Sequence, residues 1–229
     1  MPRGSTGSLR SISRLGLLAA LLLGCGNAAP EPTAAVRRPD ARTVEFPATV
    51  NAHAFNHNLA MRGYHAVVWK GGRSAGMALL QADVTDTQLL DALEALGAKP
   101  GNALGMATWD ERKDTHNHAP DQVIQGPPVE ILLRLPNHPN LVPLANVLED
   151  PGHRGLELRF GGHRANIPKW HSGCIVCLYS CPGSKVGNAR YTVRDYEKGV
   201  TRFRAKPGVL PPDGTPIGVV LRVNTPRKT

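Results

Sequence analysis

The sequence predicts an α+β fold, in which a mainly antiparallel β-sheet carries one or two helices packed on a face. Three observations lead to this prediction. Several segments alternate apolar and polar residues with a period of two, and one segment has the start and stop signals of a helix. No internal repeat and no linker interrupts the chain after residue 43. We therefore expect a single domain over residues 43–229.

The first 24 residues have the features of a signal peptide. Arg3, Arg10 and Arg14 form a positively charged start, and residues 15–23 are a run of nine that contains only Leu, Ala and one Gly. A membrane-spanning helix needs about 20 apolar residues, so the run is too short to cross a bilayer and fits the apolar part of a signal peptide. We expect residues 1–24 to be removed and the protein to be exported.

The apolar run ends at Gly24-Cys25, where a lipoprotein signal peptidase would cleave. We therefore expect Cys25 to be lipidated; ordinary cleavage after Ala28 or Ala29 is the alternative. Residues 25–42 are rich in Ala and Pro and are predicted to be the lipidated N-terminus and a flexible tether. The expected location is the periplasmic face of the cell membrane or the outer membrane. The lipid anchor would bind the membrane, and an envelope protein is the expected partner.

The charge pattern excludes some classes of function. The net charge is +9, but the basic residues are scattered. Nucleic-acid binding typically uses a basic patch or basic residues interleaved with aromatic ones, and neither pattern occurs, so we expect no nucleic-acid partner. The chain also lacks the Walker A, G-x-S-x-G and H-E-x-x-H motifs. No hydrolase, transferase or nucleotide-binding activity is indicated, and no catalytic residue is identified.

Alternating patterns predict the strands. The first covers residues 44–50, and Pro47, which cannot donate a hydrogen bond, predicts that this strand lies at an edge of the sheet. Residues 65–69 and 76–82 are predicted to form a hairpin around the glycines of residues 70–73. The remaining strands are predicted at residues 129–135, 156–160 and 217–223.

One helix has clear signals at both ends. Thr85 is a capping residue, and Gln88 completes a capping box with it. Gly97 ends the helix. Its apolar face is formed by four leucines: Leu89, Leu90, Leu93 and Leu96. A shorter helix is predicted to start at Pro143.

Apart from Cys25, every cysteine lies in one short segment. His171, Cys174, Cys177 and Cys181 form the pattern H-x2-C-x2-C-x3-C-P. This is the bacterial ferredoxin pattern with its first cysteine replaced by histidine. We expect the three cysteines on one tight loop with His171 near them. The four side chains are a candidate site for an iron–sulfur cluster, or for zinc or another thiophilic metal.

Two further interpretations of the cysteines remain open. Export argues for a structural disulfide among Cys174, Cys177 and Cys181, because neighbouring thiols pair in an oxidising compartment. The protein would then be a non-catalytic envelope binding or scaffold domain. Thiol–disulfide exchange through Cys174 and Cys177 is the other interpretation. The signal peptide has no twin-arginine pair, and a chain exported unfolded would leave a preassembled cluster behind, which conflicts with the iron–sulfur interpretation.

From about His65 to Val223 the chain resembles the YdjY-type family of bacterial envelope lipoproteins, which are described as ferredoxin-like. Two stretches carry the resemblance: the strand and helix of residues 82–101, and residues 172–183, which contain S-G-C-I-V-C-L-Y-S-C-P-G, continuing through Asn188 and Tyr191. The resemblance implies no assigned activity; electron transfer is the candidate, with Cys174, Cys177 and Cys181 as its focus.

Overall fold

The computed structural model describes residues 36–61, 63–102 and 104–224. The predicted signal peptide, Cys25 and the tether up to residue 35 lie outside these residues. In the described part of the chain the strands are β1 Arg37–Asp40, β2 Thr43–Val50, β3 His65–Trp69, β4 Leu80–Ala82, β5 Val129–Arg134, β6 Val142–Pro143, β7 Leu148–Glu149, β8 Leu158–Phe160, β9 Cys174–Cys177, β10 Val186–Asn188, β11 Arg204–Ala205 and β12 Pro216–Val223.

The helices of the same residues are short, apart from α2. The α-helices are α1 Ala52–His57, α2 Asp86–Ala95, α3 Met106–Asp110, α4 Ile167–Trp170 and α5 Val193–Lys198. The 3₁₀ turns are η1 Ala75–Met77, η2 Glu111–Lys113, η3 Leu144–Val147 and η4 Arg164–Asn166. Among the described residues, no helix is long and apolar enough to cross a membrane.

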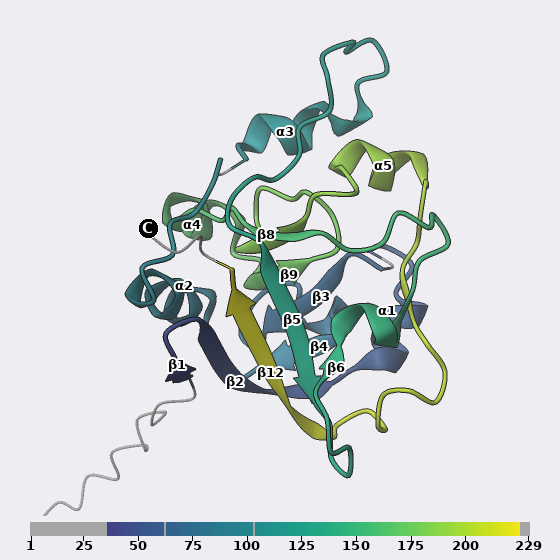
Figure 1. Cartoon of the computed structure of the whole chain (residues 1–229). Helices are drawn as coiled ribbons and strands as arrows, with labels where there is room; N and C mark the ends of the chain where they lie inside the picture. The colour runs from purple at the N-terminus through teal and green to yellow at the C-terminus, as the bar shows by residue number, and fades with distance from the viewer. Residues whose placement is uncertain (1–35, 62, 103, 225–229) are drawn as a thin grey trace, which may run out of the picture. The chain divides into compact units, whose positions relative to one another are not determined.

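The α+β class is confirmed, but the sheet is mixed and larger than the mainly antiparallel sheet that was predicted. Ten described strands form one sheet in the order β6-β5-β12-β2-β4-β3-β9-β10-β8, with β1 beside β2. The pairs β3–β4 and β9–β10 are parallel. The sheet curls (Figure 1), so that Phe160 of β8 donates its N–H to the carbonyl of Pro127 at 2.9 Å, just before β5. An alternating pattern has the same period in both directions, and therefore could not predict which pairs are parallel.

The predicted hairpin over residues 65–82 is wrong, because β3 and β4 run in parallel with η1 between them. Gly72 of this segment serves a close backbone approach rather than a hairpin turn. A Cβ on Gly72 would collide with the carbonyl oxygen of Ser172. The next two residues donate their N–H groups to the same stretch, Arg73 to the His171 carbonyl at 3.0 Å and Ser74 to the Ser172 carbonyl at 3.2 Å. The connection is thereby fixed against the segment before β9.

Strand β2 lies inside the sheet, although Pro47 predicts an edge. It pairs with β12 along one side, and with β1 and then β4 along the other. Pro47 lies between Glu45, which pairs with β1, and Ala48, which pairs with β4. Its carbonyl accepts the Asp83 N–H on that side at 3.0 Å. The backbone nitrogen of Pro47, which carries no hydrogen, therefore faces the junction between β1 and β4. At this position the proline removes no hydrogen bond between paired strands.

Helix α2 confirms the predicted signals. Thr85 accepts the Gln88 N–H at 3.0 Å and donates its own N–H to the Gln88 side chain at 2.9 Å, which completes the capping box. Gly97 follows with a φ of 75°. The second helix predicted from Pro143 is only the 3₁₀ turn η3, after which the chain enters β7.

Residues 37–40, which lie inside the predicted tether, form strand β1. Their side chains are exposed, but β1 pairs with β2, and Arg37 forms an ion pair with Glu45 at 3.2 Å. Backbone pairing needs no apolar side chains, so composition alone did not reveal this strand. The strands β5, β8 and β12 lie where the alternating patterns predict them.

Candidate metal centre

The three cysteines lie on and just after β9, which is flanked by β3 and β10 in the curled sheet. Cys174 and Cys177 are its first and last residues, and Cys181 lies in the turn that follows. All three are free thiols and are buried, with exposed fractions of 3% or less. The expectation of a single tight loop is therefore wrong, because the segment between Cys174 and Cys177 pairs with β3 and β10.

Two β-bulges shape the strand pair that carries the site. In a regular strand, residues three positions apart point to opposite faces of the sheet. Here Val68 pairs with Cys174 and Val67 with Val176, so Ile175 is an extra residue on β9. A bulge of this kind re-aims the side chains around it. It accounts for how Cys174 and Cys177 can approach each other from positions three apart.

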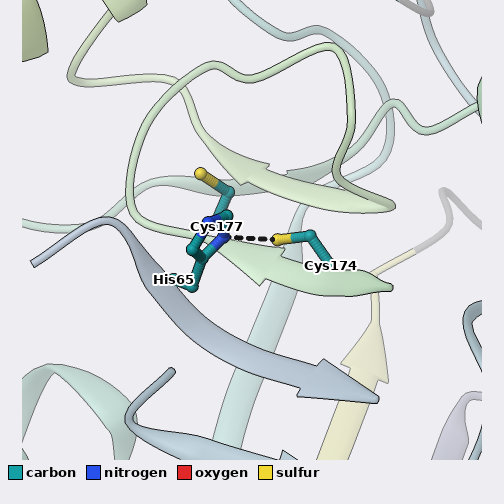
Figure 2. A group of neighbouring side chains, drawn as sticks. All are labelled: His65, Cys174 and Cys177. Atoms are coloured by element: carbon teal, nitrogen blue, oxygen red, sulfur yellow. Dashed lines mark hydrogen bonds between the residues drawn. The ribbon is translucent and has the colours of Figure 1, made fainter. Parts of the chain in front are cut away.

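His65, the first residue of β3, completes a compact group with these cysteines. One ring nitrogen, Nδ1, lies 3.3 Å from the sulfur of Cys174 (Figure 2). The Cys177 thiol is held by the Tyr64 carbonyl at 3.4 Å. One ligand atom from each of His65, Cys174 and Cys177 lies within 4.8 Å of the other two. The three side chains, all buried, could therefore hold a metal ion.

Cys181 borders this group without belonging to it. Its sulfur accepts the Gly183 N–H at 3.4 Å. The neighbouring Cys177 thiol, with smaller contributions from the Tyr64 hydroxyl and Gly183, lowers the pKa of Cys181 despite burial. The Tyr64 hydroxyl lies beside Cys181 but makes no hydrogen bond of ordinary geometry. Cys181 is thus the next soft ligand available to the site.

The electrostatics of the site favour one thiolate. Burial acts to raise the pKa of Cys174, but hydrogen bonding to Cys177 and the charge of His65 outweigh it and lower this pKa to about 5. Burial likewise acts to lower the pKa of His65, and the Cys174 thiolate outweighs it and raises that pKa. The pKa of Cys177 is raised well above its ordinary value by burial and by the neighbouring thiols of Cys174 and Cys181. Cys177 therefore stays protonated between two more acidic thiols.

His171, the histidine that the sequence assigns to the site, lies elsewhere. It is exposed, ends helix α4 in the left-handed conformation with a φ of 49°, and lines a surface cavity with Arg73 and Asp86. Gly173 also has a positive φ, of 68°. These two residues turn the chain between α4 and β9, and the structure does not bring His171 together with Cys174 and Cys177. His65 takes the place that the spacing gives to His171.

The sequence did not indicate His65 as a candidate ligand, because its contacts come from β9, more than a hundred residues away in sequence. The available signal was a histidine at the start of a strand whose other positions are apolar. Its second ring nitrogen, Nε2, is buried and has no hydrogen-bond partner. Buried polar atoms nearly always have one, and an ion or water is a common explanation for an exception. The donor set of one imidazole and two sulfurs fits a thiophilic metal.

Comparisons with known proteins place the chain in a family. A family model described as YdjY domain matches residues 39–222, a range that includes His65, Cys174 and Cys177. The chain is also similar to a protein of Escherichia coli (strain K12) described as uncharacterized protein YdjY. The two are 29% identical over 160 residues, which cover 69% of this chain and 67% of the relative. No solved structure matches the chain. The family resemblance noted in the sequence is thereby confirmed, and the chain belongs to the YdjY domain family.

Proposed function

We propose that this protein binds one thiophilic metal ion in the cell envelope, at His65, Cys174 and Cys177. The proposal is carried by the proximity of these side chains: one ligand atom from each lies within 4.8 Å of the other two. Zinc binds thiolate sulfur at about 2.3 Å, so two thiolates on one tetrahedral ion lie about 3.8 Å apart. The three side chains therefore need only a small closing movement to share one ion.

The protonation of the site supports the same proposal. Thiolates rather than thiols bind metals. The lowered pKa of Cys174 supplies one thiolate in the absence of an ion. Binding of a cation would release the protons held by His65 and Cys177, as metal binding generally does. We propose Cys181 as a fourth ligand, because it lies in the turn that follows β9 and the neighbouring Cys177 thiol lowers its pKa.

A single ion is favoured over an iron–sulfur cluster. A cluster is typically held by four cysteine thiolates. Here the cysteines beyond Cys25 number three, and two of them converge with a histidine on one point. Thiolate and imidazole ligands suit zinc, copper and iron. Iron or copper would allow electron transfer, whereas zinc has no redox chemistry and would serve in storage, delivery or structure.

The alternative is a non-catalytic envelope domain in which two of the cysteines form a structural disulfide. The proximity of the three thiols supports this alternative too. A direct test uses a Cys25→Ala variant of the full chain, so that only the three site cysteines titrate, purified without oxygen. We expect about one equivalent of metal, no acid-labile sulfide, and three thiols reactive in denaturant. One reactive thiol without metal would establish the disulfide instead, and bound sulfide would establish a cluster.

The envelope location of the proposal depends on Cys25 and the signal peptide, which lie outside the described residues. Their sequence pattern supports export and lipidation. We expect wild-type protein in the membrane fraction with an acyl mass on Cys25. We expect Cys25→Ala protein to accumulate unprocessed or in the soluble fraction. A native N-terminus at Ala29 or Pro30 without an acyl chain would disprove the lipid anchor and leave the metal proposal standing.

A further inference from the structure

Lys185 is a buried lysine beside the cysteines. Only 1% of its surface is exposed, and its ammonium lies 3.2 Å from a carboxylate oxygen of Asp86. Lysine is almost never fully buried unless it is paired. A buried ion pair recovers its desolvation penalty only in part, so it is weak evidence for stability. The position of Lys185 therefore calls for an explanation other than general stabilisation.

The contacts of Lys185 lead to the site from two directions. Its ammonium donates to the Gly183 carbonyl at 3.1 Å, and the Gly183 N–H in turn donates to the Cys181 sulfur at 3.4 Å. The backbone N–H of Lys185 donates to the Ile175 carbonyl on β9 at 3.3 Å. One residue is thus attached both to the turn that carries Cys181 and to the strand that carries Cys174 and Cys177.

Asp86 fixes the ammonium in this position. It is the first residue of α2, where the helix dipole favours a carboxylate. It is itself buried, with 6% of its surface exposed. The helix end therefore holds Asp86, Asp86 holds Lys185, and Lys185 holds the turn of residues 181–183.

We propose that Lys185 is the positioning residue of the metal site. Through its hydrogen bond to the Gly183 carbonyl it holds Cys181 in place as the fourth ligand. The proposal rests on the proposed function, since it concerns the same metal site.

The test measures cobalt(II) and zinc(II) binding by the reduced full chain without oxygen. The variants are Lys185→Met and the double variant Lys185→Met/Asp86→Asn, which replaces the ion pair by neutral groups. Lys185→Arg keeps the charge. Lys70→Met is the matched control, because Lys70 pairs with Asp83 at the surface. Residues that support metal ligands typically change affinity about 10- to 100-fold, and we expect a loss of that size in the double variant.

We also expect the thiolate-to-cobalt charge-transfer absorption of the double variant to fall, because Cys181 no longer binds. Lys185→Arg should keep most of the wild-type metal affinity, and Lys70→Met should bind metal as tightly as wild type. Thermal melting shows which variants are folded. If Lys185→Met does not fold, the metal affinity of the double variant tests the proposal. A folded double variant with wild-type affinity and spectrum would overturn the role of Lys185. Absence of binding by wild type would overturn the proposed function itself.

Discussion

Helix α2 and strand β9 carry the two most distinctive local patterns of the sequence, and the patterns differ in what they predict. The signals of α2 are local: a capping box joins Thr85 to Gln88, three positions along the chain. The cysteines of β9 are equally close in sequence, but their geometry depends on β3, more than a hundred residues earlier. The helix formed as predicted, whereas the cysteine segment became a bulged strand with a different histidine.

This difference teaches that a spacing motif indicates which potential ligands are present more reliably than it indicates which side chains meet. Cys174 and Cys177 lie in one compact group, and each side chain carries its own soft donor atom. The histidine of the motif lies outside this group, because which side chains meet depends on register and bulges. A strand site of this kind is completed by a partner strand that the motif does not contain.

The largest loss of stability is expected for a substitution at the bulge of β9, where long-range pairing sets the geometry. Ile175 is fully buried between the two cysteines. Ile175→Ala should lower the free energy of unfolding by about 3 kcal/mol, through lost burial and the cavity left behind. Denaturant unfolding of the reduced chain measures this loss. A change below about 1 kcal/mol would show that the packing of β9 does not depend on the bulged residue.

An intermediate loss of stability is expected at Asp150. Its side-chain partners, Tyr191 and Thr201, are distant in sequence like those of β9 but polar like the cap of α2. Its carboxylate accepts hydrogen bonds from the Tyr191 hydroxyl at 2.7 Å, the Thr201 hydroxyl at 2.9 Å and the Gly155 N–H at 2.7 Å. Asp150→Ala leaves these donors without their partner and should lower the free energy of unfolding by about 2 kcal/mol. Denaturant unfolding at pH 7 measures the change.

Lowering the pH should reduce the free energy of unfolding of the wild type, in part through protonation of Asp150. Burial acts to raise the pKa of Asp150, but the hydrogen bonds from Tyr191, Gly155 and Thr201 outweigh it and hold the pKa below its ordinary value of 3.8. A carboxyl with a lowered pKa in the folded state stabilises the fold above the unfolded-state pKa, and this stabilisation is lost as the pH falls through the folded-state pKa. The stability difference between wild type and Asp150→Asn should therefore shrink below about pH 4. A constant difference would contradict the assignment.

The smallest stability effect is expected at the helix cap. Thr85→Ala removes the side-chain oxygen that accepts the Gln88 N–H at 3.0 Å and should cost about 1 kcal/mol. Thr85→Ser keeps that oxygen and should unfold close to wild type. A free energy of unfolding of Thr85→Ala equal to that of wild type would contradict the role of the cap.

The sequence predicted the features that depend on neighbouring residues. Examples are the α+β class, the capped helix and the strand ending at Val223. It failed where partners at long range decide the outcome. Pro47 is tolerated inside the sheet because it faces a junction of β1 and β4, and His65 joins the site only through its pairing with β9. Neither fact leaves a periodic signal in the chain.

The central claim is that His65, and not His171, completes the metal site, and one measurement tests it most directly. Zinc affinity is measured by competition with a chromophoric chelator for wild type, His65→Ala and His171→Ala, each reduced and without oxygen. Loss of a ligand should weaken binding by at least about 100-fold in His65→Ala, while His171→Ala should match wild type. Thermal melting confirms that both variants are folded. The reverse result, with binding lost in His171→Ala and kept in His65→Ala, would contradict the assignment of the site.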